Sequence, residues 1–221
     1  MSNPPAAKRS ESMTGDVDVE FPEFVEPPAE PYGLLRSWLD AAKEAKIREP
    51  FALALATADE RGRTSSRMVV VSGVTDEGLL FTSHSTSQKG RQLAANPWAS
   101  GVLYWRETSQ QIIVGGPVRK LSDEEAEAAW NARPVFTHAM SSACRQSTEF
   151  EDYAQVQTAR AEGRRLAALE TPLPRPASYS LYRLEPELFE FWANGTDRLH
   201  ERLRFDRDGE GGGWTTRRLQ P

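Results

Sequence analysis

The sequence predicts a mainly β fold of the α+β class, a small closed or split antiparallel β-barrel with peripheral helices. Short runs rich in β-branched and apolar residues, such as 51–57, 67–74 and 78–83, are separated by tight turns, which is typical of a β-meander. Most of these runs are joined by turns rather than by helical crossovers, which disfavours a parallel sheet. Helical segments interrupt the series, and about six or more strands in this arrangement favour a barrel.

The individual elements follow from local patterns. Apolar residues at helical spacing predict an amphipathic helix over 33–47. Ser85 or Ser87 can cap a second helix that Asn96-Pro97 ends, and Ser122 to Glu125 forms a capping box that opens a third. Helices are therefore expected at 33–47, 87–96, 122–132 and 148–169, and strands at 51–57, 67–74, 78–83, 100–105, 110–121, 178–184, 188–193, 198–206 and 213–219.

The charge of the chain is concentrated at its beginning. Residues 1–32 contain seven acids and two bases, which accounts for the whole net charge of −5, and they hold six of the 15 prolines. Such a segment cannot bury enough apolar surface to offset the entropy of ordering it, so we expect a flexible acidic arm over 1–32 and one folded domain over 33–221. The folded part has balanced charge, which argues against nucleic acid or an anionic membrane as partner.

Several classes of protein are excluded by what the sequence lacks. No apolar run reaches the ~18 residues of a membrane span, and the first residues lack the apolar core of a signal peptide, which predicts a cytoplasmic protein. One cysteine, Cys144, and three scattered histidines give no internal disulfide and no metal cluster. Neither a GxGxxG nor a GxxxxGK[ST] motif occurs, so a Rossmann or P-loop nucleotide site is unsupported.

A first candidate site combines Arg67, at the start of an apolar strand, with Thr82, Ser83 and Lys89. If 67–72 and 78–83 pair as a hairpin, the two hydroxyls end near Arg67. The helix that begins near Ser87 adds free backbone N–H groups, and together these groups suit a phosphate. The alternative is a strand-end arginine in solvent and an ordinary surface lysine.

A second candidate is the segment Arg198 to Arg204. If it is a strand, Arg198, His200, Arg202 and Arg204 share one face, while Leu199, Leu203 and Phe205 share the other. Cationic groups in a row repel one another unless an anionic or electron-rich partner faces them. The alternative is a solvated outer face of the barrel.

A third candidate consists of amides that can read the edge of a heterocycle, because an amide offers both a donor and an acceptor. These are Gln110 and Gln111 in an apolar strand, and Gln146 before the long helix. The alternative for the latter stretch is cap chemistry, with Ser147 as the cap of the helix.

Beyond these local patterns, residues from about 33 to 221 resemble the pyridoxamine-phosphate oxidase family of flavin mononucleotide (FMN)-binding split barrels. The resemblance depends on the order and spacing of several short stretches over some 150 residues. The matching stretches are Arg67-Met-Val-Val-Val, Gly78 to Ser83, Ser87-Gln-Lys-Gly90, Leu93 to Pro97, Gln111, Arg133-Pro134, Gln146-Ser147, Phe189 to Trp192, Arg198 to Arg204 and Gly213-Trp followed by Arg218-Leu-Gln-Pro. Ile47 to Pro50, Asn96 to Ile113 and Asn194 to Arg204 read like the phenazine-biosynthesis flavin oxidases of this family.

The resemblance implies a homodimer that binds FMN in clefts between its subunits. It assigns to FMN the residues Arg67, Met68, Val69, Val70, Thr82, Ser83, Gln88, Lys89, Gln111, Gln146, Ser147, Trp192 and Arg202. It assigns to the substrate the residues Ser72, Arg133, Thr137, Arg198 and His200, of which His200 and Arg198 are the catalytic candidates.

The sequence departs from the vitamin-forming members of the family at three positions. Ser72 stands where a lysine is usual and Ala129 where a tyrosine is usual, so only Arg133 and Thr137 remain of the clamp for the substrate phosphate. Each lost charge-assisted contact costs roughly 1.5–3 kcal/mol. Gln88 replaces a usual arginine at the flavin phosphate.

Together with these departures, the resemblance implies an oxidase that desaturates a reduced, planar phenazine carboxylic acid. The resemblance implies that a hydride passes to the flavin and that dioxygen is the final acceptor, which gives hydrogen peroxide. Two alternatives stay open: a pyridoxine/pyridoxamine 5'-phosphate oxidase, and a flavin-binding module of the same barrel type without enzymatic activity.

Overall fold

The computed structural model describes residues 19–194, 199–209 and 212–221, and it shows nine strands, five α-helices and two short 3-10 helices within these ranges. The strands are β1 (Ala52–Ala58), β2 (Thr64–Val74), β3 (Leu79–His84), β4 (Trp98–Trp105), β5 (Gln110–Lys120), β6 (Tyr179–Leu184), β7 (Leu188–Ala193), β8 (Glu201–Arg207) and β9 (Trp214–Leu219). The helices are η1 (Pro22–Phe24), α1 (Pro31–Glu44), α2 (Gln88–Ala95), α3 (Asp123–Asn131), η2 (Val135–Thr137), α4 (His138–Ala143) and α5 (Tyr153–Ala167).

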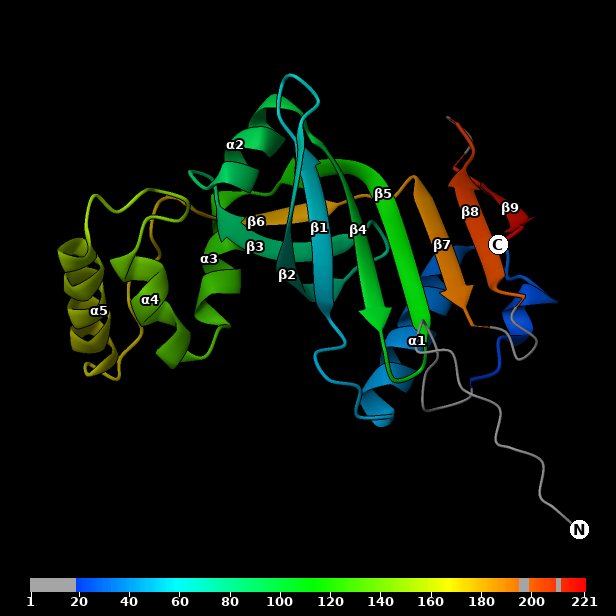
Figure 1. The fold of residues 1–221 in the computed structure, drawn as a ribbon, viewed down its shortest axis with the longest axis horizontal. Coiled ribbons are helices and arrows are strands. Elements are labelled where there is room, and N and C mark those ends of the chain that lie inside the picture. The colour runs from blue at the N-terminus through cyan, green and yellow to red at the C-terminus, as the bar shows by residue number, and fades with distance from the viewer. Residues whose placement is uncertain (1–18, 195–198, 210–211) are drawn as a thin grey trace, which may run out of the picture. The chain divides into compact units, whose positions relative to one another are not determined.

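The strands form a closed antiparallel barrel with an extension, as the sequence predicts. Their hydrogen-bonded order is β4-β1-β2-β3-β6-β5-β7-β8-β9, and β4 also pairs with β5, which closes the first six strands (Figure 1). Strand β5 pairs with β7 as far as Gly115 and with β6 from Val118 onward. The segment Gly115-Gly116-Pro117 is therefore the point at which β5 changes its partner.

The chain divides into two compact units. Strands β1, β4 and β5 each have residues in both units. Unit 1 comprises the described residues up to Ala54, Gly101–Gly115 and the chain from Pro186 onward. Unit 2 comprises Leu55–Ser100 and Gly116–Glu185.

The core of unit 1 is aromatic and lies between helix α1 and the antiparallel strands β7 and β8. The apolar face of α1 packs Tyr32 at 5.2 Å from Phe189 and Trp38 at 5.3 Å from Phe191, measured between ring centroids. The α1 helix begins where the side chain of Glu30 accepts hydrogen bonds from the N–H groups of Tyr32 and Gly33. Because burial of an aromatic side chain contributes strongly to folding, this face fixes α1 against the sheet.

The end of the acidic arm takes part in unit 1. Phe21 is 5% exposed and its ring lies 4.9 Å from that of Trp38. Arg218 of β9 donates to the carbonyl oxygens of Phe24 and Val25 at 2.6 and 2.7 Å. Residues 19–25 are therefore attached to the core and to β9, while the part of the arm over 1–18 lies outside the described residues.

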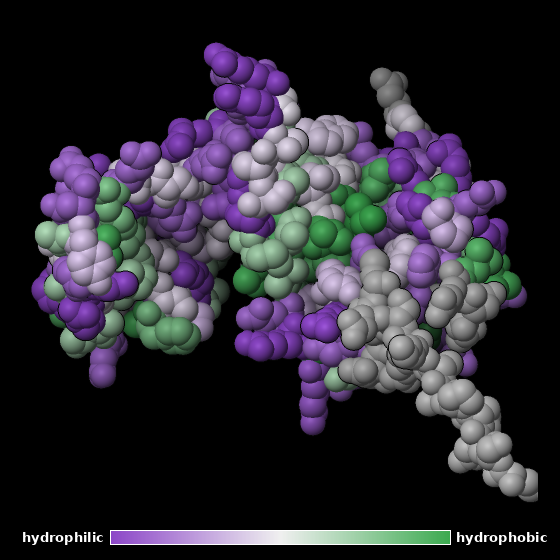
Figure 2. Space-filling model, in the orientation of Figure 1, coloured by the Kyte–Doolittle hydropathy of each residue, from purple (hydrophilic) through white to green (hydrophobic). Residues whose placement is uncertain are grey.

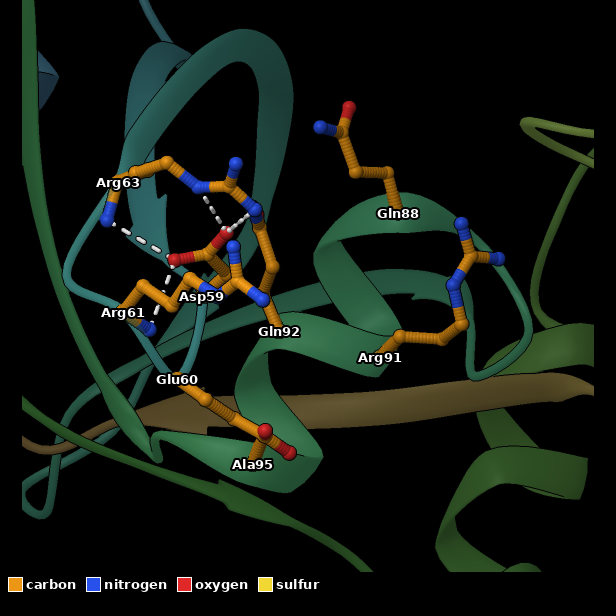
Figure 3. A pocket seen from close by; sticks show the side chains of 8 residues that line it. All are labelled: Asp59, Glu60, Arg61, Arg63, Gln88, Arg91, Gln92 and Ala95. Carbon is orange, nitrogen blue, oxygen red and sulfur yellow. Dashed lines mark hydrogen bonds and ion pairs between the residues drawn. The ribbon is translucent and has the colours of Figure 1, made fainter.

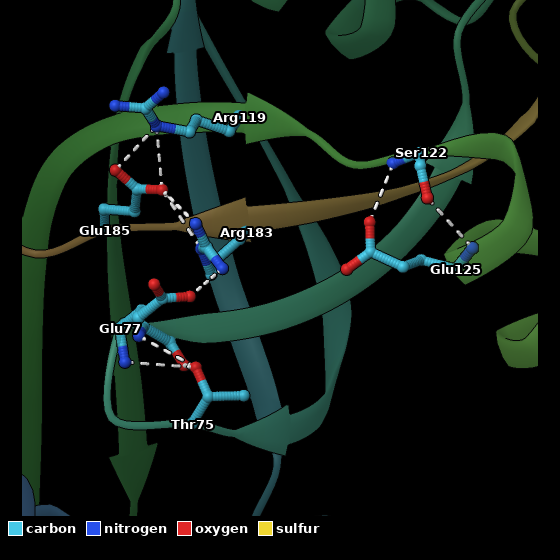
Figure 4. A network of polar contacts seen from close by, with 8 residues as sticks. Thr75, Glu77, Arg119, Ser122, Glu125, Arg183 and Glu185 are labelled. Carbon is cyan, nitrogen blue, oxygen red and sulfur yellow. Dashed lines mark hydrogen bonds and ion pairs between the residues drawn. The ribbon is translucent and has the colours of Figure 1, made fainter.

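Unit 2 is built on the hairpin β2–β3, which continues into β6. Val71 pairs with Phe81 and Gly73 with Leu80, with a bulge between the two pairs, so the expected hairpin is present. On its outer side, Arg183 contacts Glu77 and lies 2.8 Å from Glu185, which also pairs with Arg119 (Figure 4). This network joins the β2–β3 turn to β5 and β6.

The helices of unit 2 match the sequence at α2 and α3 and differ from it later. The expected long helix over 148–169 begins only at Tyr153, because Asp152 rather than Ser147 is its N-cap and accepts a hydrogen bond from the Gln155 N–H at 2.8 Å. Helices η2 and α4 were not predicted. Helix α4 packs on α5 at Gly163, where a Cβ would lie 2.4 Å from the sulfur of Met140.

Candidate active site

Arg67 on β2 forms the centre of a polar cluster in unit 2. Its guanidinium donates to Thr57 Oγ1 at 2.7 Å, to Ser65 Oγ at 2.5 Å and to the Leu55 carbonyl at 3.3 Å. Gln92 of helix α2 braces the same group, because its Oε1 accepts from Thr57 and Ser65. Every one of these partners is neutral, so Arg67 is held in place without having its charge balanced.

Lys89 on α2 is the second cation of this cluster. Its ammonium group donates to Ser83 Oγ at 3.1 Å, and Ser83 Oγ lies 3.4 Å from Ser87 Oγ. Burial lowers the pKa of Lys89, and the nearby Arg67 lowers it further. Burial also lowers the pKa of Arg67. Neither cation forms an ion pair with a carboxylate of the described residues, and two partly buried cations without a counter-ion are the arrangement that an anion completes.

The start of helix α2 supports this cluster. Ser87 caps the helix and accepts a hydrogen bond from the Gly90 N–H at 3.2 Å. A Cβ on Gly90 would lie 2.4 Å from the Ser85 carbonyl oxygen, so glycine permits the close approach of the helix to the end of β3. The first turn of α2 thus presents backbone N–H groups beside Lys89, as the sequence predicts.

The remaining residues that the sequence assigns to this end of the site lie on β2, β3 and α2. Met68 and Val70 point outward at 60% and 66% exposure, whereas Val69 is buried. Thr82 is half-buried beside Ser83 on β3. Gln88, at the first position of α2, is exposed.

A cavity of about 440 Å³ lies beside this cluster (Figure 3). It is lined by Asp59, Glu60, Arg61, Arg63, Gln88, Arg91, Gln92 and Ala95. Asp59 holds the turn by accepting from the N–H groups of Arg61 and Arg63, and hydrophilic side chains surround the tip of the β1–β2 connection (Figure 2). Gln88 is the one predicted site residue in its lining.

Unit 1 contributes a row of three predicted residues across neighbouring strands. Gln111 of β5 pairs with Trp192 of β7, and Trp192 pairs with Arg202 of β8. Residues opposite one another in an antiparallel sheet project from the same face, so these side chains share a face. His200 extends this group, with its ring 4.9 Å from that of Trp192. Arg198 lies outside the described residues.

The expected cationic face of β8 is present, but its charges have partners within the chain. Arg202 lies 2.7 Å from Glu190, and Arg204 lies 2.7 Å from Asp206. Leu203 and Phe205 are fully buried on the opposite face, as expected. The prediction that Leu199 joins them is wrong: it is 58% exposed, because β8 begins only at Glu201.

Arg133, predicted to bind substrate, lies against aromatic rings of unit 2. Its guanidinium carbon is 5.0 Å from the Trp130 ring and 5.2 Å from the Tyr179 ring, and Nη2 donates to the Thr137 carbonyl at 3.2 Å. Its Nη1 is buried without a hydrogen-bond partner in the described part of the chain. A buried charged donor without a partner is costly, so this nitrogen is suited to a ligand.

The other residues of the predicted substrate clamp use their hydroxyls locally. Ser72 Oγ donates to the Leu80 carbonyl at 3.2 Å, and Thr137 Oγ1 donates to the Pro134 carbonyl at 2.8 Å. Gln146 and Ser147 are exposed, and Ser147 adopts the left-handed conformation with φ of 62°. The structure does not bring these two residues into contact with the cluster around Arg67.

Sequence reasoning missed His84, a buried residue that lies near both Lys89 of the cationic cluster and Arg133. It is 2% exposed, and its Nδ1 lies 2.8 Å from Ser178 Oγ. Burial lowers its pKa, and Arg133 and Lys89 lower it further, so it lies near both cations. The available signal was its place directly after Thr82-Ser83 at the end of a strand.

The rest of the described chain adds two findings. It contains no helix of the length and apolarity that crossing a membrane requires. No group of three or more His, Cys, Asp or Glu side chains in these residues is arranged to hold a metal ion.

Comparison with known proteins identifies the class to which this barrel and its cationic cluster belong. Residues 39–193 match the model of the pyridoxamine 5'-phosphate oxidase family, and residues 179–221 match that of the pyridoxine 5'-phosphate oxidase C-terminal dimerisation region. The chain belongs to the pyridoxamine 5'-phosphate oxidase family and is an enzyme of the oxidoreductase class, as the sequence predicts.

Three similar proteins show which members of the family this chain resembles. The chain is 55% identical over 212 residues to dihydrophenazinedicarboxylate synthase of Pseudomonas chlororaphis, an alignment that covers 96% of this chain and 93% of the relative. It is 40% identical to a pyridoxine/pyridoxamine 5'-phosphate oxidase of Paraburkholderia phytofirmans, over 86% of this chain and 89% of the relative. The crystal structure of PhzG from Burkholderia lata 383 in complex with tetrahydrophenazine-1-carboxylic acid superposes with a TM-score of 0.88 at 51% identity, covering 94% of this chain and all of that one.

Proposed function

We propose that this protein is an FMN-dependent oxidase of phenazine biosynthesis that desaturates a reduced phenazine carboxylic acid. The observation that carries the choice of substrate is the 55% identity, across nearly the whole chain, to a relative named dihydrophenazinedicarboxylate synthase. The PhzG structure with tetrahydrophenazine-1-carboxylic acid supports the same class of planar, carboxylated substrate.

The residues of unit 2 fit the phosphorylated end of FMN. Arg67 and Lys89 supply two charges that no carboxylate of the described chain neutralises, and the hydroxyls of Thr57 and Ser83 accept hydrogen bonds from them. The residues proposed to hold the cofactor are Arg67, Met68, Val69, Val70, Thr82, Ser83, Gln88, Lys89, Gln111, Gln146, Ser147, Trp192 and Arg202. In this proposal Gln111 bonds the edge of the ring system, and Trp192 and Arg202 complete the site.

The chemistry of the reaction is supplied by the cofactor, and the protein orients the substrate. FMN, when held by these residues, would supply the redox chemistry: a hydride and a proton leave the substrate, and dioxygen takes up the two electrons and two protons as hydrogen peroxide. Arg198 and His200 are proposed to meet the substrate, with His200 fixed against Trp192. Arg133 is proposed to bind a substrate carboxylate through its buried Nη1, which has no partner in the described residues.

A homodimer is part of this proposal. Met68 and Val70 leave an apolar stripe exposed on β2, and such a stripe is suited to burial against a second copy. The match of residues 179–221 to a dimerisation region supports the same assembly. Gln146 and Ser147, which lie apart from the Arg67 cluster in one chain, are then contributed by the partner subunit.

A pyridoxine 5'-phosphate oxidase is the second candidate, supported by 40% identity to a relative of that name. The site argues against it, because the hydroxyls of Ser72 and Thr137 bond to backbone carbonyls and Ala129 supplies no donor. A phosphate held by Arg133 alone lacks the contacts that each contribute roughly 1.5–3 kcal/mol.

Purified protein loaded with FMN tests the proposal. Peroxide formation is measured with a reduced phenazine dicarboxylic acid and, separately, with pyridoxine 5'-phosphate. We expect a clearly higher kcat/KM for the phenazine. Efficient oxidation of pyridoxine 5'-phosphate alone would support the second candidate, and a yellow protein that oxidises neither would indicate a flavin-binding module.

A further inference from the structure

Glu190 on β7 is a buried carboxylate for which neither the sequence nor the proposed mechanism provides a role. Its side chain is 6% exposed, and its one ion pair in the described chain is with Arg202, whose side chain is 29% exposed. Arg202 Nε donates to Glu190 Oε1 at 2.7 Å, and Nη2 lies 2.7 Å from the same oxygen. The remaining nitrogen, Nη1, donates to the backbone carbonyl of Gln220 at 3.0 Å.

The sheet register shows that this pairing is selective. Glu190 lies directly opposite Arg204, whereas Arg202 lies opposite Trp192. The carboxylate nevertheless bonds diagonally to Arg202. Arg204 is bound by Asp206, which also accepts from Arg217 at 2.7 Å. Two acids therefore divide three arginines between them, and Glu190 fixes the guanidinium of Arg202, the residue that pairs with Trp192.

A buried ion pair is weak evidence for stability, because desolvation of both charges offsets their attraction. Such a pair does, however, fix the position of its members. An arginine has five N–H donors. The contacts to Glu190 and Gln220 use the Nε donor and at most one donor on each terminal nitrogen. At least two N–H donors on the terminal nitrogens stay available to a ligand in the row of Gln111 and Trp192.

We propose that Glu190 is a positioning residue of the flavin site, which holds Arg202 beside Trp192 with the Gln220 carbonyl as a second support. The proposal rests on the assignment of Arg202 to FMN in the proposed function. It gives the segment after β9 a part in the site, through a backbone atom rather than a side chain.

The first test is a double-mutant cycle on FMN affinity in the full-length protein, measured by quenching of flavin fluorescence. Glu190→Gln keeps the shape of the side chain and removes its charge. We expect it to weaken FMN binding by about tenfold in the wild type. In an Arg202→Gln background the same change should alter affinity less than about twofold, because a residue that acts through Arg202 has nothing left to position. A merely structural role would give equal effects in both backgrounds and would overturn the proposal.

The second test avoids the buried pair and so remains valid if Arg202→Gln does not fold. A chain that stops after Leu219 loses the Gln220 carbonyl and should bind FMN several-fold more weakly. Gln220→Ala keeps that carbonyl and should bind as the wild type does. Asp206→Asn, which removes the partner of Arg204 one row away, serves as the matched control and should leave affinity unchanged.

The outcomes separate the two proposals. A wild type that binds FMN while E190Q and the shortened chain bind it equally well overturns the role of Glu190 and leaves the proposed function intact. A wild type that does not take up FMN overturns both.

Discussion

Lys89 donates a hydrogen bond to Ser83 at 3.1 Å, while burial and, after it, the charge of Arg67 lower the pKa of its ammonium group. Two positive groups held near one another by hydroxyls and amides, with no acid of the described chain between them, are an unfavourable arrangement in the free protein. A bound anion attracts both cations and so offsets their mutual repulsion. The proposed binding of a phosphorylated cofactor would therefore account for both charges, that of Arg67 on β2 and that of Lys89 in the first turn of α2.

Arg67→Ala is expected to weaken FMN binding by about 10- to 100-fold, because a charge-assisted contact of roughly 1.5–3 kcal/mol is lost. Fluorescence titration of the purified variant with FMN measures the change. Arg119→Ala is the matched control, since Arg119 is exposed on β5, pairs with Glu185 and lies outside the candidate site. Wild-type affinity in the Arg67 variant would remove this residue from the site.

Lys89 gives the site an expected dependence on pH. Burial and Arg67 place the pKa of Lys89 below the ordinary value of 10.5. The folded protein without FMN therefore releases the Lys89 proton at a lower pH than the unfolded chain does. Between those two pKa values the unfolded chain binds more protons, so the contribution of Lys89 to stability rises with pH there. FMN binding should show the opposite trend, since the ligand favours the charged amine.

FMN affinity is therefore expected to fall as pH rises through the lowered pKa of Lys89 toward 10.5. The phosphate does not confound the measurement, because its second pKa is about 6 and it is dianionic throughout this range. Lys89→Arg keeps the charge at high pH and should flatten the profile. An equally steep profile in both proteins would assign the titration to another group.

Much of this fold could be predicted from residue patterns. The strand-and-turn alternation placed β1 to β9 to within a few residues, since tight turns and period-two burial are local properties. The β2–β3 hairpin was also predictable, because the tight turn at Asp76 to Gly78 joins its two strands.

Contacts between residues far apart in the chain could not be predicted in the same way. Gln92 supports Arg67 across 25 residues, and Thr57 does so across 10. Arg133 stacks on Trp130 and Tyr179 because helix α3 packs against β6, a tertiary contact without a local signal. Similarly, Glu190 was not expected as the partner of Arg202, since the register of β7 with β8 brings these two residues together.

Gly90→Ala is expected to lower the stability of unit 2. The added Cβ would lie 2.4 Å from the Ser85 carbonyl oxygen and 2.5 Å from that of His84, and both are backbone atoms that cannot move independently. Overpacking of this kind costs typically ~1–3 kcal/mol. Gly209→Ala is the control, because a Cβ there meets no atom within 4 Å. Thermal unfolding of the two variants should differ by several degrees, and equal melting temperatures would contradict the close approach of α2.

Substrate choice is expected to change when the lost phosphate clamp is rebuilt. Ser72 is exposed on β2, so a lysine fits there without displacing the core, and Ala129 is half-buried on α3 next to the Trp130 on which Arg133 stacks. Ser72→Lys with Ala129→Tyr adds a charged and a neutral donor for a phosphate. With roughly 1.5–3 kcal/mol for a charged contact, kcat/KM for pyridoxine 5'-phosphate should rise by about 10- to 100-fold.

The tyrosine also fills space, so turnover of a tricyclic phenazine acid should fall in the same variant. Peroxide formation with each substrate measures both effects, and Ser72→Ala is the control that removes the hydroxyl without adding a charge. An unchanged preference in the double variant would mean that Arg133 and these two positions do not face the same ligand.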